Sequence, residues 1–277
     1  MAQNLATKFS PKVSERLHSE SVVGDVTNKN YDWTGVATIK VYSVDTMTMN
    51  DYSRSSDNRF GSANEIGTTL QTWALEQDRS FTGTIDTLNS SQSQGVTKPG
   101  EVIARQLREE IVPEVNAYVL QTIVTAGAAA NRDDIVADAA TSSSNAFTNF
   151  LDIQANISDN LGMQKGRVAV MTANYYNMLK QGGFVLDSES AYRDRKSGNL
   201  GTVDGCKVVI VTSSELPANT DLIITHEDVT TFADVLTDYQ TLKNPKGISG
   251  YLIQGRLAYD AFVDINKVNC IGIHKTA

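Results

Sequence analysis

The chain has little of what secreted and membrane proteins depend on. Its 277 residues include only two cysteines, Cys206 and Cys270, which is too few for a disulfide framework, so we expect a reducing, cytosolic setting. No stretch approaches the roughly 18 consecutive apolar residues of a membrane-spanning helix, and residues 1–20 contain no apolar segment of the kind found in signal peptides. We therefore expect neither secretion through a signal peptide nor insertion into a membrane.

Positive charge is also scarce, because 24 Lys and Arg stand against 32 Asp and Glu and give a formal net charge of −8. A dedicated nucleic-acid-binding protein would carry a basic stripe that contacts phosphates. The basic residues Lys8, Lys12 and Arg16 are interspersed with Glu15 and Glu20, which favours a surface role over nucleic-acid binding. Weak, salt-sensitive contact with nucleic acid is the alternative.

Signatures of catalysis are largely missing. The sequence contains no G-x-S-x-G nucleophile elbow, no G-x-x-x-x-G-K-[ST] phosphate loop and no G-x-G-x-x-G dinucleotide motif after a strand. Only three histidines occur, and His226-Glu227-Asp228 is the one acid-rich segment from which a hydrolase triad could draw. A charged loop after a strand is the favoured interpretation, and a cytosolic hydrolase that uses the His226 segment is kept as an alternative.

A zinc site is a further alternative, because Cys206, His226, Cys270 and His274 are of the residue types that zinc prefers. Structural zinc sites normally bring paired knuckles such as C-x-x-C, and Cys206 stands alone before an apolar run. Buried free thiols are therefore the favoured interpretation. We predict no catalytic residues, no cofactor and no bound metal.

What the sequence does contain is a change of hydrophobic period along the chain, which predicts an α+β fold. Residues 36–44 and 73–85 alternate apolar and polar side chains with a period of two, as half-exposed strands do. The polar residues 46–67 between them exceed the roughly 12–15 residues that compact domains tolerate without structure. A projecting hairpin is favoured here over a disordered surface loop.

A long helix is predicted next, at residues 98–126, where apolar side chains recur at three- and four-residue steps. Pro99 suits the first turn of this helix, and Pro113 is predicted to kink it. Its opposite face carries Arg105 and Arg108. The simplest interpretation is that this face is exposed to solvent. The more specific alternative is that its charged side chains pair with another subunit.

The remaining segments predict a small α/β unit and then long strands. Helices are expected at residues 147–161 and from Thr172 to Lys180, and strands at 167–171, 206–212, 221–225 and, beyond a turn at 244–247, at 251–263. Residues 1–35, by contrast, are polar, and their apolar residues are too scattered to build a core. We expect them to form an arm that lies on a neighbouring molecule.

The order of these elements resembles that of the major capsid (coat) proteins of tailed bacteriophages. It runs from a polar arm and a projecting hairpin through a long helix and a small α/β unit to the returning strands. This Hong Kong 97-like family shares its shell fold with herpesvirus floors and bacterial encapsulins. The resemblance spans nearly the whole chain. Its most specific pieces are residues 78–81 (DRSF), 100–102 (GEV), 112–118 (VPEVNAY), 201–205 (GTVDG), 244–248 (NPKGI) and 255–263 (GRLAYDAFV).

The resemblance implies a division of the chain. The implied parts are an N-terminal arm (1–35), an extended hairpin loop (36–95), a peripheral domain with its spine helix (96–144), an axial domain (145–227), peripheral return strands (228–265) and a C-terminal segment (266–277). Some family members carry a long N-terminal scaffolding segment, for which this chain has no room. A separate scaffold protein or a processed precursor is therefore expected.

The function implied is structural. Such a chain assembles with itself into pentamers and hexamers that form an icosahedral head around double-stranded DNA, in a virion assembled in the host cytoplasm. The implied partners are a scaffold protein, a portal, decoration proteins and, without specificity, the packaged DNA. An encapsulin-type shell around a cargo enzyme is the nearest alternative.

Within such a shell, we predict assembly positions on the hairpin and on the long helix. They are Trp73, Arg79, Phe81, Arg105 and Arg108. Because the arm and the hairpin lack a core of their own, we expect Trp73, Phe81 and Ile85 to be buried only against neighbouring subunits.

Overall fold

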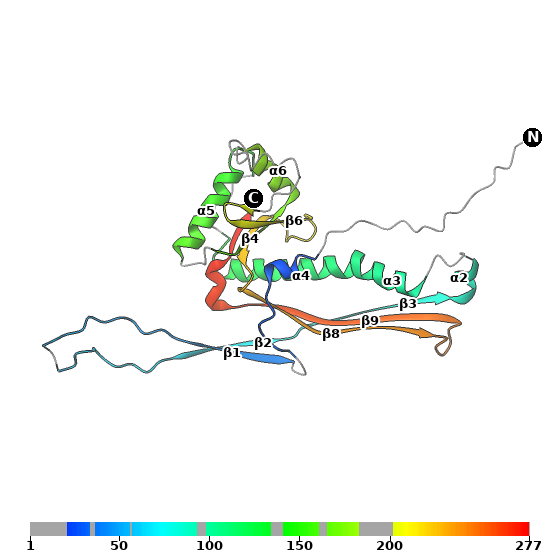
Figure 1. Cartoon of the computed structure of the whole chain (residues 1–277), viewed down its shortest axis with the longest axis horizontal. Helices are drawn as coiled ribbons and strands as arrows, with labels where there is room; N and C mark the ends of the chain where they lie inside the picture. Colours follow the sequence, from blue (N-terminus) through cyan, green and yellow to red (C-terminus); the bar gives the residue numbers. More distant parts are fainter. Residues whose placement is uncertain are drawn as a thin grey trace, which may run out of the picture.

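The computed structural model describes residues 21–33, 37–55, 57–92, 98–133, 141–160, 165–182 and 202–276. Figure 1 shows a hairpin that projects on its own, a long helix that runs along a three-stranded sheet, and an α/β unit around a five-stranded sheet. The expected α+β class is therefore confirmed. The predictions for Lys8, Lys12, Arg16, residue 201 and the end of the 147–161 helix lie outside the described residues.

The three-stranded sheet contains, in spatial order, β3 (Gln77–Asp86), β9 (Gly250–Val263) and β8 (Thr230–Lys243). All neighbours are antiparallel. The predicted turn joins β8 to β9, and its residues Asn244 (φ 50°) and Gly247 (φ 85°) adopt the left-handed angles that these two residue types tolerate best. The long strand predicted at residues 251–263 is confirmed.

The middle of this sheet depends on a glycine. Gly255 of β9 is in register with Phe81 of β3 on one side and with Tyr239 of β8 on the other. A Cβ atom at Gly255 would collide with the Phe81 ring and lie 2.8 Å from Cδ1 of Tyr239. The rings of Phe81 and Tyr239 therefore pack directly against Gly255 and leave no room for a larger side chain there.

The long helix is present but is not uniform. It comprises α3 (Pro99–Gln106), one π-helical turn η1 (Leu107–Ile111) and α4 (Val112–Ala129). In the π turn, the backbone N–H of Val112 bonds to the carbonyl of Leu107, five residues earlier. Pro113 has no N–H to donate, and its ring crowds the carbonyl four residues before it. The interruption expected at Pro113 thus takes the form of a π turn just before it.

The α/β unit surrounds a sheet in the order β10 (Gly272–Lys275), β7 (Thr220–His226), β4 (Arg167–Thr172), β6 (Cys206–Val211) and β5 (Thr202–Val203). Only the β4 and β6 pair is parallel, and every residue of β4 is buried. The helices of the unit are α5 (Ala146–Asp159) and α6 (Ala173–Gln181). As predicted, Thr172 caps α6, because its Oγ1 accepts a hydrogen bond of 3.2 Å from the backbone N–H of Tyr175.

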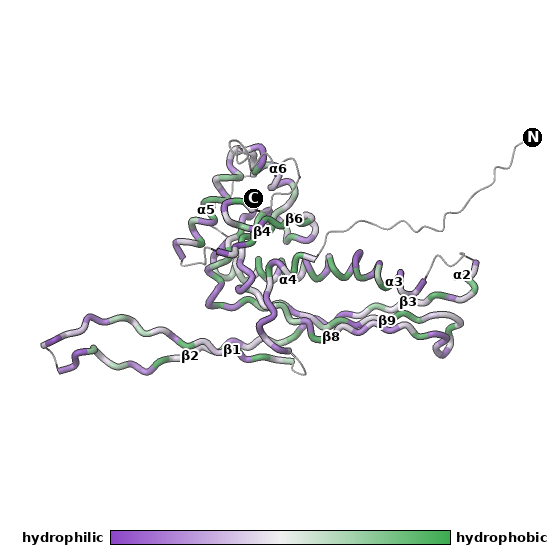
Figure 2. The backbone as a smooth tube through the Cα atoms, in the orientation of Figure 1, coloured by the Kyte–Doolittle hydropathy of each residue, from purple (hydrophilic) through white to green (hydrophobic). Residues whose placement is uncertain are grey.

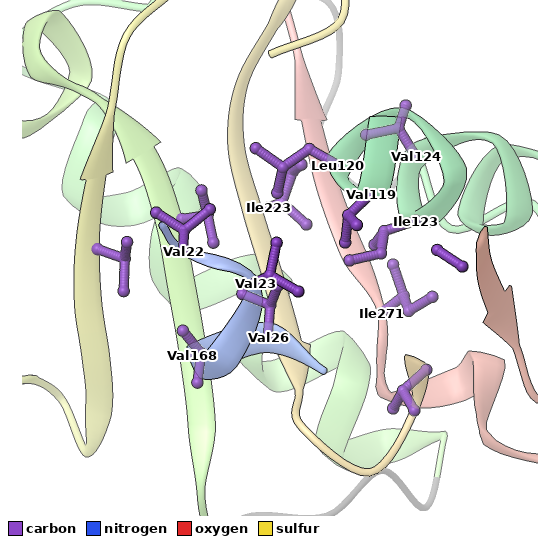
Figure 3. Close-up of a cluster of buried hydrophobic side chains, with 14 of the residues drawn as sticks. Val22, Val23, Val26, Val119, Leu120, Ile123, Val124, Val168, Ile223 and Ile271 are labelled. Carbon is purple, nitrogen blue, oxygen red and sulfur yellow. The ribbon is translucent and has the colours of Figure 1, made fainter. Parts of the chain in front are cut away.

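The largest core cluster contains residues that the sequence assigned to an arm. Val22 and the short helix α1 (Val23–Val26) pack against Val119, Leu120 and Ile123 of α4, as Figure 3 shows. Val26 is completely buried. The expectation that the apolar residues of 1–35 build no core is therefore wrong for residues 21–33, which belong to the body of this chain.

The projecting hairpin consists of β1 (Thr38–Val44) and β2 (Thr68–Ala74), which pair antiparallel over seven residues. Residues 45–67 connect them as an extended loop (Figure 1), so the predicted hairpin is confirmed. The single strand predicted at residues 73–85 is wrong. It divides between β2 and β3, which belong to different sheets.

Four further elements were not predicted from the sequence. They are α2 (Thr87–Gln92), the short strand β5, the 3₁₀ helix η2 (Ile265–Cys270) and the edge strand β10. Within the described part of the chain, no helix combines the length and the apolar character that crossing a membrane requires.

Candidate functional site

The hairpin exposes apolar side chains that no other described part of the chain covers. Eight of the fourteen large apolar side chains that are exposed in the described residues lie between residues 42 and 70. Met49 is 93% exposed and Phe60 is 81% exposed. Figure 2 shows hydrophobic stretches along the hairpin, where no other element lies against it. Exposed apolar surface on a projecting element is typical of a site that binds another protein.

The loop at the tip of the hairpin is locally closed. The backbone N–H of Ser53 donates to the carbonyl of Arg59 over 3.0 Å, and the rings of Tyr52 and Phe60 meet edge to face with centroids 5.0 Å apart. These contacts define a tip formed by residues 52–55 and 57–60. The two sides of the tip are thus held together by a backbone hydrogen bond and a ring contact.

The root of the hairpin is held by a stack of three aromatic rings. Phe262 of β9 lies between Trp33 and Trp73, with centroid distances of 5.0 and 5.4 Å and interplanar angles of 15° and 7°. Tyr31 adds an edge-on contact with Trp73 at 5.0 Å. This root cluster joins the segment before β1, the hairpin and the three-stranded sheet. It fastens the hairpin to the body.

Trp73 is therefore 6% exposed within its own chain. The expectation that Trp73 needs a neighbouring subunit for burial is wrong, and its assignment as an assembly position stays a prediction. Phe81 is half-buried, because its ring lies over Gly255 beside Tyr239. Ile85 of β3 is also half-buried.

The predicted arginines lie on β3 and on the long helix, whereas Trp73 belongs to β2 at the root of the hairpin. Arg79 of β3 donates from Nε to Oε1 of Glu114 on α4 over 2.7 Å, and both side chains remain about half exposed. Arg105 of α3 donates to Glu109 one helical turn later over 2.9 Å. Arg108 lies on the π turn. The structure thus brings Arg79 to the helix that carries the other two arginines.

The sequence did not predict two junctions, by which we mean buried polar side chains that join separate elements through hydrogen bonds. Asp260, in β9, accepts hydrogen bonds from the Tyr118 hydroxyl (2.6 Å) and from the backbone N–H of Glu76 (2.9 Å), the residue where the hairpin leaves for β3. Burial, helped by the hydrogen bond to Asp260, raises the pKa of Tyr118 above its usual value. The hydroxyl therefore stays protonated and holds its place.

The second junction joins the helix to the α/β unit. Asn116 on α4 accepts from the backbone N–H of Val22 (3.2 Å) and donates to Oε1 of Glu215 (3.0 Å). The other oxygen of Glu215 accepts from the backbone N–H and the hydroxyl of Thr212. Both Asn116 and Glu215 are buried. The sequence around each of them contains no motif or spacing that predicts this contact.

The residues of the hydrolase alternative do not form a triad-like arrangement. Nδ1 of His226 accepts a hydrogen bond from the backbone N–H of Asp228 over 3.1 Å, and the Asp228 carboxylate lies 3.7 Å away. Nε2 faces the backbone of Gly166, where an added Cβ would lie 2.7 Å from it. Nδ1 is thus engaged by a main-chain donor, and Nε2 is turned toward a neighbouring backbone.

The residues of the zinc alternative are dispersed. Cys206 and Cys270 are free thiols in two different core clusters, and His274 is 3.1 Å from the amide nitrogen of Asn149. In the described ranges, no group of three or more His, Cys, Asp or Glu side chains is arranged to hold a metal ion. The structure gives this alternative no support.

We predict that Cys206 resists alkylation in the folded protein. Burial raises the pKa of its thiol to about 11, and the thiolate is the reactive form. After iodoacetamide treatment at pH 8, peptide mass spectrometry should find Cys206 unmodified in native protein and fully modified in urea. Rapid labelling of native Cys206 would contradict the burial seen here.

Similarity to known proteins is found at the level of structure. No family model and no curated protein matches the sequence. A solved structure from Mycobacterium phage Che8 superposes with a TM-score of 0.78 at 16% identity, covering 98% of this chain and 96% of that one. The capsid structure of the Cyanophage P-SCSP1u gives 0.75 at 11% identity, covering 98% and 93%.

The mature capsid of bacteriophage PhiM1 gives a TM-score of 0.73 at 11% identity and covers 99% of this chain and 92% of that one. In each of these three comparisons the similarity covers at least 98% of this chain. Taken together, these comparisons show that the chain has the fold of phage capsid structures.

Proposed function

We propose that the chain is the major capsid protein of a tailed phage, a structural protein that forms the icosahedral head around double-stranded DNA. The observation that carries this proposal is the shared fold over 98% of the chain with a phage capsid structure. The exposed apolar hairpin supports it, because such a surface calls for a protein partner. The role is structural, in the virion shell, after assembly in the host cytoplasm.

In this proposal the parts of the chain have separate roles. Within the expected hairpin loop (36–95), the hairpin of β1 and β2 overlaps a neighbouring subunit, whereas β3 stays with β9 in the sheet of its own chain. The peripheral domain (96–144 and 228–265) forms the sides of each capsomer, and the axial domain (145–227) surrounds the five- and six-fold axes of pentamers and hexamers. Scaffold, portal and decoration proteins are the further partners, and DNA is contacted without specificity.

Electron microscopy and mass photometry of the purified chain test this proposal. We expect closed shells tens of nanometres across, or discrete pentamers and hexamers, when the chain is alone or supplied with the neighbouring structural proteins of its source. A chain that stays monomeric under all these conditions would overturn the proposal. Shells that enclose a protein cargo instead of nucleic acid would indicate an encapsulin.

Arg79→Ala should lower the yield of shells several-fold and leave the subunit folded. Exposed ion pairs such as Arg79 with Glu114 contribute little to stability, so circular dichroism and the Tm should barely change. Lys98→Ala is the matched control, since Lys98 also forms an exposed pair, with Glu101. Equal yields from the two variants would remove Arg79 from the assembly surface.

A further inference from the structure

The edge strand β10 lies between the two large core clusters of the chain. On one face, an added Cβ atom at Gly127 of α4 would collide with the side chain of Ile273. The next residue, His274, points to the opposite face, where its Nε2 lies 3.1 Å from Nδ2 of Asn149 on α5. β10 therefore packs against the long helix on one face and against α5 on the other.

The imidazole of His274 is shielded from water, and only one of its nitrogens has a partner. The residue is 1% exposed, and within the described part of the chain its Nδ1 has no hydrogen-bond partner. The partner of Nε2 is the amide of Asn149, which is itself buried. Buried polar atoms are nearly always paired in native proteins. The lone Nδ1 is therefore an exception that calls for an explanation.

A second proton on this ring has no good place in either orientation of the Asn149 amide. If Nδ2 of Asn149 donates to Nε2, protonation of Nε2 sets two donors against each other. If the amide is rotated and its oxygen accepts from Nε2, protonation of Nδ1 creates a buried, charged N–H without an acceptor. The surroundings of His274 thus suit the neutral imidazole and disfavour the imidazolium.

The charged groups around His274 compensate only in part, as far as the described residues show. Asp221 of the neighbouring strand β7 attracts the charged ring, but its carboxylate already accepts a hydrogen bond from a threonine hydroxyl. Tyr175 of α6 faces the ring, and its hydroxyl donates to a main-chain carbonyl. Lys275, next on β10, pairs with Asp133, and the contact from α5 is an uncharged amide. Burial lowers the pKa of His274, and the attraction of Asp221 offsets this only partly.

We propose that His274 is an acid-sensitive latch, at which protonation of the ring releases β10 from α5 and loosens the α/β unit. The same segment also holds the turn after α4. The guanidinium of Arg132 donates there to the carbonyls of Ile271 and Asn269. The carbonyl of Arg132 accepts from the backbone N–H of Ile273. Release of β10 therefore reaches the end of the long helix. The latch does not depend on the proposed function.

Linkage gives the direction of the pH dependence. In the unfolded chain, His274 takes up a proton near the ordinary histidine pKa of about 6.5, whereas the lowered pKa in the folded chain delays protonation to a lower pH. Below about pH 6.5 the unfolded state therefore binds more protons than the folded state. Stability is complete above this pH and falls as the pH falls through it.

Urea unfolding of the dilute, unassembled full-length chain tests the linkage. Between pH 7.5 and 5.5 the unfolding equilibrium constant of the wild type should rise about tenfold, the effect of one histidine that is charged only when it is unfolded. His274→Gln should remove most of this rise. His226→Gln is the matched control and should keep it, because Nδ1 of His226 already lies 3.7 Å from the Asp228 carboxylate. A wild type without the rise, or a His274→Gln variant that keeps it, would overturn the proposal.

Hydrogen exchange distinguishes a latch from global unfolding. In the wild type, the amides of β10 and α5 should lose about tenfold of their protection between pH 7.5 and 5.5, and low concentrations of urea should hardly affect their exchange. Exchange that depends strongly on urea would mean that His274 is protonated only when the whole chain unfolds. That result would overturn the latch.

Two further measurements do not rely on the His274→Gln variant. In native wild-type protein, the NMR resonance of the His274 ring should titrate well below pH 6.5, and a midpoint at or above about 6.5 would overturn the proposal. Asn149→Asp gives the protonated ring a carboxylate partner in place of the amide. This variant should lose the destabilisation at pH 5.5. If it responds to acid as the wild type does, the contact between α5 and β10 is not the latch.

Discussion

Replacing Phe262 with alanine should lower the free energy of unfolding by about 3 kcal/mol and loosen the hairpin from the body. A buried Phe→Ala change costs about 3–5 kcal/mol, and each aromatic pair adds about 0.5–1.5 kcal/mol beyond its buried area. Phe262 is only half-buried, which lowers the first figure, but it stacks on Trp33 and on Trp73. One substitution therefore removes both stacking contacts.

Fluorescence and circular dichroism separate the two parts of this effect. Since both tryptophans lie in the root cluster, Phe262→Ala should shift the emission to longer wavelength before any denaturant is added. Far-UV circular dichroism should retain most of the wild-type signal, because the α/β unit has a separate core. Phe262→Leu, which keeps an apolar side chain at this position, is the control. Its emission maximum should lie between those of the wild type and of Phe262→Ala. An unchanged emission maximum in Phe262→Ala would contradict the role given to the stack.

The same root region shows how far the sequence could predict the structure. Residues 46–67 are too long and too polar for an ordinary connection, and this pattern correctly predicted the hairpin. The division between β2 and β3 was invisible, because the chain stays extended through Leu75 and Glu76 and side chains keep alternating. Which sheet a strand joins depends on partners that are distant in sequence, here β1 and β9.

Burial in the N-terminal segment was missed for a related reason. Val22, Val23 and Val26 share one face of a single helical turn, which is too short for a periodic signal. Their burial is determined by α4, almost a hundred residues later. The role of Trp73 was partly foreseen, as a hairpin position that must be covered, but its cover comes from Phe262 of its own chain.

The buried acids were the least predictable. Asp260 lies in a strand whose alternation suggests an ordinary exposed acid, and Glu215 lies in a short polar loop before β7. Each is buried because donors from several elements meet at its carboxylate. Such convergence depends on tertiary structure. For the same reason the pairing of Arg79 with Glu114 could not be seen from either residue alone.

Asn116→Leu should cost about 2–4 kcal/mol of unfolding free energy, as measured by urea denaturation followed by circular dichroism. The substitution keeps a similar volume but removes the acceptor of the Val22 N–H and the donor to Glu215. A buried polar group that loses its partner costs about 1–3 kcal/mol, and more when it is charged. A variant within about 0.5 kcal/mol of the wild type would contradict this account.

The double variant Asn116→Leu with Glu215→Met distinguishes a polar junction from simple packing. If the cost of Asn116→Leu arises because the Glu215 carboxylate is left short of a donor, removing that carboxylate as well should return part of the stability, so the two changes should not add. The backbone N–H groups of Val22 and Thr212 would still lack acceptors, so recovery should be incomplete. Strict additivity would mean that Asn116 acts through its shape alone. Coupling would instead show that this hydrogen-bonded pair helps to join the long helix to the segment between β6 and β7 of the α/β unit, beside the apolar contacts that the two already share.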